Sequence, residues 1–353
     1  MTCIMKNVWI VIWMISLNSQ AQENNGLKLS GFAEVYFARD FRNPSNNTRA
    51  GFLYNHTRTN EVMPNLAFLK ATYSQAQVRT NLAIMIGTYA QFNLAAEPEL
   101  LRNIYEANVG IKLSKSSDLW LDAGVFASHI GFESAISKDC WTLTRSILAE
   151  NSPYYESGVK VSYNTPNGKW TLVGLLLNGW QRIRRIDGNT TIAWGTQIQF
   201  KPMAAITLNS STFIGNDKPN ATKQMRYFHD FFCVIQLKKT GIILGFDYGL
   251  EQKKTGSSSM NRWYSPVVIL RQKWSDKWAT SIRWETYQDL NGVIINTPTT
   301  NGFDISGMSI NLDYSFLENV LVRAEGKYYS SKTPIFESKT DSFALTASLA
   351  VSF

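Results

Sequence analysis

Residues 342–353 read SFALTASLAVSF, and they decide the class of fold because two chemically different sets of side chains alternate along them. One set is apolar and consists of Phe343, Leu345, Ala347, Leu349, Val351 and Phe353. The other set is small or polar and consists of Ser342, Ala344, Thr346, Ser348, Ala350 and Ser352. A period of two is typical of a β-strand whose two faces have different surroundings.

The same alternation recurs along most of the chain, in about sixteen segments. We expect strands at 28–38, 64–74, 77–88, 103–113, 118–128, 154–164, 168–178, 191–201, 204–214, 225–238, 241–251, 261–274, 277–288, 302–316, 318–329 and 341–353. Most of these segments have roughly 10–14 residues, whereas strands in soluble proteins average nearer five or six. A tilted strand needs about 9–11 residues to cross a bilayer, so the lengths favour a transmembrane sheet.

The predicted connections alternate between short and long. The short ones lie at 75–76, 114–117, 165–167, 202–203, 239–240, 275–276 and 317. The long ones lie at 39–63, 89–102, 129–153, 179–190, 215–224, 252–260, 289–301 and 330–340. Outer-membrane barrels have tight periplasmic turns and long outer loops, and an even strand count leaves both termini on the periplasmic side. Closure is also expected, because lipid offers no partner to a free backbone group at a sheet edge.

Aromatic residues make up 13% of the chain, and many share the outward parity of the predicted strands. Those at the short-turn ends are Tyr163, Trp170, Phe200, Trp274, Trp278, Phe316 and Phe353. Those toward the long-loop ends are Trp180, Trp194, Tyr227, Tyr264, Trp284, Tyr328 and Phe343. Such rings prefer the two interfaces of a bilayer. We therefore predict an all-β fold, a transmembrane antiparallel β-barrel of about 16 strands with a water-filled lumen and a long third extracellular loop.

The N-terminus has the features of a secretory signal peptide. Lys6 supplies a positive charge, the apolar run 8–15 is too short to span a bilayer as a helix, and Ser19-Gln20-Ala21 fits a small-x-small cleavage site. We expect a signal peptide at 1–21 and a single outer-membrane β-barrel domain at 22–353, in the outer membrane of a Gram-negative bacterium. The formal net charge is +8. Because the basic residues are scattered among nearly as many acids, we expect no nucleic-acid partner.

Four stretches carry a resemblance to a known family. They are GFAEVYF at 31–37, GVFASHIGFES at 124–134, SPYYESGVKVSY at 152–163 and LNGWQ at 177–181. In these stretches the chain resembles the OmpL-like β-barrel porins of the Gram-negative outer membrane, and the barrel pattern extends the likeness over nearly the whole mature chain. The resemblance implies a porin among outer-membrane lipids, with a water-filled channel for passive diffusion of small hydrophilic solutes or ions. The terminal Phe353 is similar to the signal that the barrel assembly machinery reads, which would make that machinery a partner.

The inward-facing charges of the predicted barrel have both signs. The predicted lumen wall consists of Asp122, Glu156, Lys160, Arg226, Arg283, Glu285, Arg323 and Glu325. Because the two signs nearly balance, wall charge alone does not predict ion selectivity. Inward glycines, Gly195 and Gly245 among them, leave space for water or for a loop.

The third long connection lies within SHIGFESAISKDCWTLTRSILAENSP at 128–153. In general porins of similar strand count this loop folds into the lumen and narrows it, which is an analogy of architecture. An outward-packed loop is the alternative. The apolar side chains of the loop argue against free movement in water, and 142–150 is predicted as a short helix. For an inward fold, the predicted pore constriction consists of Glu133, Asp139 and Arg145.

Two other classes of function stay open at this point. One is a structural or adhesive barrel with a plugged lumen, and the other is an outer-membrane hydrolase. Ser128 and His129 are adjacent and would face opposite ways in a strand, and the chain contains no G-x-S-x-G and no metal-ligand spacing. We therefore predict no catalytic residue, cofactor or metal. Solute identity and the existence of a homo-oligomer stay open too.

Overall fold

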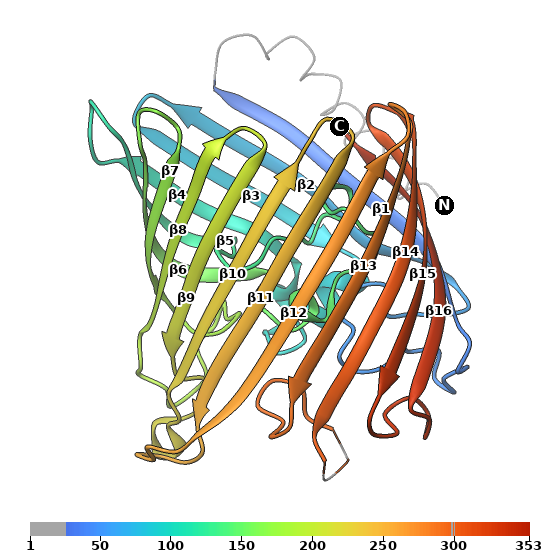
Figure 1. Ribbon diagram of the computed structural model, residues 1–353. Coiled ribbons are helices and arrows are strands. Elements are labelled where there is room, and N and C mark those ends of the chain that lie inside the picture. Colours follow the sequence, from blue (N-terminus) through green and yellow to red (C-terminus); the bar gives the residue numbers. More distant parts are fainter. Residues whose placement is uncertain (1–25, 298, 300) are drawn as a thin grey trace, which may run out of the picture.

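The computed structural model describes residues 26–353 except 298 and 300, and it is a closed antiparallel barrel of sixteen strands (Figure 1). Each strand pairs with its neighbours in sequence, and β1 closes the barrel against β16. The strands are β1 (Leu27–Asp40), β2 (Val62–Gln75), β3 (Val78–Ile86), β4 (Ile104–Lys112), β5 (Asp118–Ala127), β6 (Tyr155–Asn164), β7 (Trp170–Leu177), β8 (Ala193–Met203), β9 (Ile206–Gly215), β10 (Arg226–Gln236), β11 (Thr240–Gln252), β12 (Met260–Lys273), β13 (Trp278–Asp289), β14 (Phe303–Leu317), β15 (Val320–Ser331) and β16 (Asp341–Ser352). All of the predicted strands are confirmed, with ends that shift by a few residues. The predicted signal peptide lies outside the described residues.

The helical elements of the described chain all lie in long connections. They are α2 (Thr88–Asn93), η1 (Glu99–Asn103), η2 (Ser137–Asp139), α3 (Ile147–Glu150) and η3 (Asn220–Thr222). Within the described ranges, no helix is long and apolar enough to cross a membrane. Figure 1 shows the short turns at one rim, drawn at the top, and the long connections at the other. The barrel therefore sorts its loops by length as the sequence predicts.

Strand parity separates the two surfaces of the barrel. On β16 the side chains of Leu345 and Leu349 are exposed on the outside, while Ala344 and Ala350 are buried on the inside. The outside of β16 is therefore apolar, as expected of a lipid-facing surface. The predicted outward position of Trp180 is wrong, because this residue follows the end of β7 and the alternation does not extend to it. Its ring lies inside the barrel, edge to face with the buried rings of Phe213 and Phe228.

The buried core fills part of the lumen. Phe52 from the first long connection packs edge to face against Phe303 and Tyr329, with ring centroids 5.0 and 5.7 Å apart. Leu148 from the third long connection is fully buried in a cluster with Val267 on β12. Two long connections thus supply much of the apolar packing inside the barrel, and the third one positions the site described next.

Candidate functional site

The third long connection, residues 128–154, lies inside the barrel (Figure 1) and is hydrogen-bonded to the wall. The amide of Thr144 donates to Glu325 on β15 over 2.6 Å. The amide of Ile147 donates to Glu285 on β13 over 2.6 Å. These contacts decide the direction that the sequence left open, and the loop folds inward.

A buried ion-pair network holds the loop on this wall. Arg283 lies 2.8 Å from Glu325, and Lys327 lies 2.8 Å from Glu285. The loop contributes Glu133, whose carboxylate is 3.6 Å from the Arg283 guanidinium. Each of these five side chains is at most 2% exposed, so each charge depends on its partners instead of on water. Removing one member of such a buried pair typically costs about 3–5 kcal/mol.

Small side chains on β14 make this network geometrically feasible. Ser309 lies in register between Arg283 on β13 and Lys327 on β15. Gly307 lies opposite Glu285, and a Cβ at this glycine would come within 2.9 Å of the Glu285 carboxylate. The long side chains of β13 and β15 can therefore meet across β14.

The first part of the predicted helix at 142–150 is not helical, because Thr142 and Thr144 bind to this network instead. Arg283 donates to the hydroxyl of Thr142 over 2.8 Å, and also to the carbonyl and hydroxyl of Thr144 at 2.8 and 2.9 Å. These two threonines are thereby held in an irregular backbone. The α-helix covers only Ile147–Glu150, with Ser146 as its N-cap.

Two of the three predicted constriction residues fix the shape of the loop. The Arg145 guanidinium donates to three backbone oxygens of the loop, those of Ser134, Ala135 and Leu143. Glu133 accepts from the amide of Ser146 over 2.9 Å and also from its hydroxyl. Asp139 is exposed and does not meet the other two. The role of these residues as the narrowest part of the pore stays a prediction.

His129 anchors the start of the loop. Its Nδ1 lies 2.8 Å from Glu156, and its Nε2 lies 2.8 Å from the backbone oxygen of Thr212. Both partners are acceptors, so both ring nitrogens must carry a proton to satisfy them. Burial by itself lowers the pKa of His129, but the adjacent Glu156 carboxylate outweighs burial and the pKa is raised.

Inward glycines receive side chains of the loop. A Cβ at any of three positions would overlap a loop residue: Gly195 with His129, Gly241 with Trp141, and Gly245 with Phe132. The space at Gly195 and Gly245, which the sequence assigned either to water or to a loop, is therefore taken by the loop.

The opposite wall, made of β2–β6, has basic side chains in contact with solvent, although Asp122 and Glu156 on it are buried. Arg79 donates to Asp122 over 2.7 Å, and Lys70 lies 2.7 Å from Glu106. The side chains of Arg79 and Lys70 are 32% and 24% exposed, in contrast to the network beneath the loop. Lys160, which pairs in register with Asp122, is also partly exposed.

The predicted lumen residues thus fall into separate groups. Arg283, Glu285 and Glu325 meet beneath the loop. Arg323 lies beside them and is 2.7 Å from Asp313. The remaining four divide among three places: Asp122 and Lys160 on the open wall, Glu156 under His129, and Arg226 in a separate pair with Glu251.

Two buried carboxylates in loops were missed by the sequence reasoning. Glu150 accepts from the amides of Tyr54 and Asn55 at 2.9 and 3.1 Å, which joins the third long connection to the first. Glu97 accepts from the amide of Ile183 over 2.8 Å. Loops have no repeat from which burial can be deduced, so no local signal distinguished these acids. No group of three or more His, Cys, Asp or Glu side chains in the described residues is arranged to hold a metal.

Comparison with known proteins places this geometry among outer-membrane channels. The family model described as "Putative beta-barrel porin-2, OmpL-like" matches residues 26–353. No curated protein sequence matches the chain at a significant level.

Several solved structures share the fold. The anion-selective porin from Comamonas acidovorans is similar with a TM-score of 0.62 and 6% identity, over 94% of this chain and 100% of that one. OmpF of Salmonella typhi, solved in complex with daunomycin, is similar with a TM-score of 0.61 and 10% identity, over 93% and 98%. The trimer form of in-vitro folded OmpT from Vibrio cholerae is similar with a TM-score of 0.60 and 9% identity, over 94% and 100%. At such identities the likeness establishes the barrel and leaves the solute open.

Proposed function

Because this chain belongs to the OmpL-like β-barrel porin family, we infer that it acts as an outer-membrane porin. We propose that small hydrophilic solutes diffuse passively through it, between the inward loop and the wall of β2–β6. One observation carries this path. The charges that hold the loop on β13 and β15 are at most 2% exposed, whereas Arg79 and Lys70 on the opposite wall remain in solvent. The loop also packs on this wall, because its Leu148 shares a buried cluster with Leu66 on β2 and Met85 on β3. The proposed path therefore runs past the part of the wall nearer the short turns, where Arg79 and Lys70 lie.

Single-channel conductance in a planar bilayer tests this path. Deletion of 134–148 should raise the conductance, because the part of the loop that crosses the lumen is removed. Deletion of 254–256, in the exposed connection between β11 and β12, is the control and should leave the conductance unchanged. An unchanged conductance in a correctly folded 134–148 deletion would disprove the constriction.

Family membership favours a channel without enzymatic activity, and we propose that the protein has no catalytic residue. The three predicted constriction residues keep a place in the proposal, with Asp139 as the charge that faces the path and Glu133 and Arg145 as its support. A folded wild-type barrel that carries no current would favour the plugged structural or adhesive barrel instead.

We propose that the channel prefers anions at its short-turn mouth. A hollow of about 580 Å³ there has five cations and two acids among its lining residues: Lys238, Lys239, Lys273, Lys277, Arg271, Asp276 and Asp313. Arg271 is 3.0 Å from Asp313, whereas the four lysines form no ion pair with any described residue. Positive charge at a pore mouth attracts anions and repels cations.

We also propose that outer-membrane lipids surround the barrel and that the assembly machinery reads Phe353. This residue is 71% exposed, and its backbone pairs with Gly31 at the point where the barrel closes. The proposal rests on the resemblance of the C-terminal strand to the signal for that machinery.

A homo-oligomer is the third proposed partnership. Polar side chains lie on the outward face of β8–β10: the Thr196 and Thr212 hydroxyls are 2.6 Å apart, and Ser210 lies 2.8 Å from His229. Polar groups without a hydrogen-bond partner are costly against lipid, and in a pair of hydroxyls only one of the two protons is donated within the pair. We propose that a second copy of the chain covers them.

A further inference from the structure

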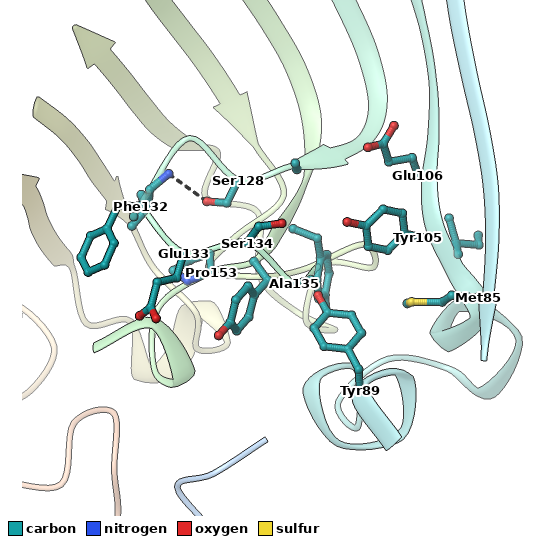
Figure 2. Close-up of a pocket in the computed structure, with 16 residues that line it drawn as sticks. Met85, Tyr89, Tyr105, Glu106, Ser128, Phe132, Glu133, Ser134, Ala135 and Pro153 are labelled. Carbon is teal, nitrogen blue, oxygen red and sulfur yellow. Dashed lines mark hydrogen bonds between the residues drawn. The ribbon is translucent and has the colours of Figure 1, made fainter. Parts of the chain in front are cut away.

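A cavity of about 200 Å³ lies between the start of the inward loop and the wall formed by β3 and β4 (Figure 2). Tyr89 on α2 and Tyr105 on β4 form one side of it, and Phe132 and Ser134 of the loop form the other. Ligand pockets for drug-sized molecules are about 300–1,000 Å³, so this one suits a smaller solute. It lies next to Glu106, on the wall that borders the proposed path.

The aromatic rings of this cavity are held in fixed positions. Tyr105 stacks on Phe68 with centroids 4.6 Å apart and an interplanar angle of 5°. Tyr89 contacts Tyr154 edge to face, with centroids 5.8 Å apart. Because neighbours already immobilise these rings, a solute that lies against them does not need to order them.

Two phenol hydroxyls remain free for a solute. Tyr154 is paired with Asn55, but Tyr89 and Tyr105 have no hydrogen-bond partner among the described residues. Figure 2 shows both hydroxyl ends turned toward the loop residues across the cavity. A phenol can donate one hydrogen bond and accept another, so the cavity offers both functions.

The charge of the cavity limits the class of solute. Its charged lining residues are Glu106 and Glu133, and both are already engaged. Glu106 lies 2.7 Å from Lys70, and Glu133 accepts from Ser146. Among the described residues that line the cavity there is no cation to attract an anion, and both carboxylates already have a cation within 4 Å.

We propose that this cavity is a solute-binding site for small neutral polyhydroxylated molecules of the monosaccharide class. The proposal rests on the proposed channel, since the solute would reach the cavity through the lumen. The apolar face of a sugar ring would lie against the aromatic rings, and its hydroxyls would pair with Tyr89 and Tyr105. Such a site would retain a solute briefly during diffusion and make its transport saturable.

D-glucose is the probe, and sorbitol, a polyol without a ring, is the comparison. Glucose should reduce the ion current of the channel along a saturating curve, and sorbitol should have a weaker effect because it presents no flat ring. Tyr105→Phe should raise the half-saturating glucose concentration about fivefold, as expected for one lost hydrogen bond. Tyr105→Ala should raise it about tenfold or more, because the ring is lost as well.

Trp120→Phe is the matched control, because Trp120 is a lumen aromatic outside the cavity and contacts Arg79 instead. It should leave the half-saturating concentration unchanged. Calorimetric titration of the detergent-solubilised protein with glucose measures binding without requiring current. A conducting channel with no saturable glucose effect and no calorimetric binding would overturn the site but leave the porin. Equal half-saturation in wild type and Tyr105→Ala would also overturn it.

Discussion

At the scale of single residues, Arg283 forms ion pairs with three buried carboxylates, whereas the neighbouring Lys327 pairs with one. It faces Glu325 at 2.8 Å, Glu285 at 3.5 Å and Glu133 at 3.6 Å, and none of these groups reaches water. A buried cation of this kind joins the wall to the loop through both charge and hydrogen bonds.

Arg283→Met should therefore lower the free energy of unfolding by about 3–5 kcal/mol, because three carboxylates lose their shared cation. Urea unfolding of the barrel in lipid measures the change. Arg184→Met is the control, since its ion pair with Asp187 is exposed and should be worth at most about 1 kcal/mol. Equal effects of the two substitutions would contradict a structural role for the network.

His129 should make stability depend on pH. Its pKa is raised in the folded protein above the ordinary value of about 6.5. The stabilisation is therefore complete below about pH 6.5 and is lost as the pH rises through the folded-state pKa. Between about pH 6 and pH 9, wild type should lose more stability than His129→Gln in urea unfolding. A loss of the same size in both proteins would show that the imidazolium does not hold the loop.

At the scale of elements, the inward loop packs against β11 by placing the ring of Phe132 over Gly245. Phe132 occupies the space that a side chain at Gly245 would need, and its ring also lies 5.9 Å from that of Phe232. The position of the loop therefore depends on Gly245, although a residue with a side chain would normally strengthen a strand at this point.

Gly245→Leu should displace the loop and destabilise the barrel by about 1–3 kcal/mol, because the new side chain overlaps Phe132. Adding Phe132→Ala should restore part of the lost stability by removing the overlap. Urea unfolding measures the change in stability, and the noise of the single-channel current reports the displacement of the loop. A double variant that is no more stable than Gly245→Leu alone would argue against this contact.

At the scale of the whole molecule, the lysines at the short-turn mouth should govern ion preference. The reversal potential in a salt gradient should indicate anion preference in wild type. Changing Lys238, Lys239, Lys273 and Lys277 together to Gln should move it toward zero, whereas Lys115→Gln at a different short turn should not. A reversal potential that is the same in all three proteins would rule out control by this mouth.

The patch of outward polar side chains on β8–β10 faces either a second copy of the chain or lipid, and the two cases predict different results for a double variant. Thr212→Val combined with His229→Leu should dissociate an oligomer that uses this face, as seen in the mass of the detergent-solubilised protein. Thr286→Val, outside the patch on β13, is the control. If the patch faces lipid, the double variant should instead keep the wild-type mass and unfold at higher urea concentration.

Sequence alone determined the barrel. The number of strands, their limits and the side of the sheet that each residue faces follow from a period of two, which is a local property. The exposed Leu345 beside the buried Ala344 was predictable from twelve residues, and lipid then requires closure. Trp180 marks the limit, because it lies three residues beyond the end of β7, where the alternation no longer decides the direction of a side chain.

Only the tertiary structure decided how the lumen is filled. The contact between Thr144 and Glu325 joins residues 181 positions apart, and nothing local to either one indicates the other. Glu133 and Arg145 could be identified as charges in a loop, but not as its internal supports. The loop folds inward because buried charges on β13 and β15 require partners away from water, and the loop backbone and Glu133 provide them.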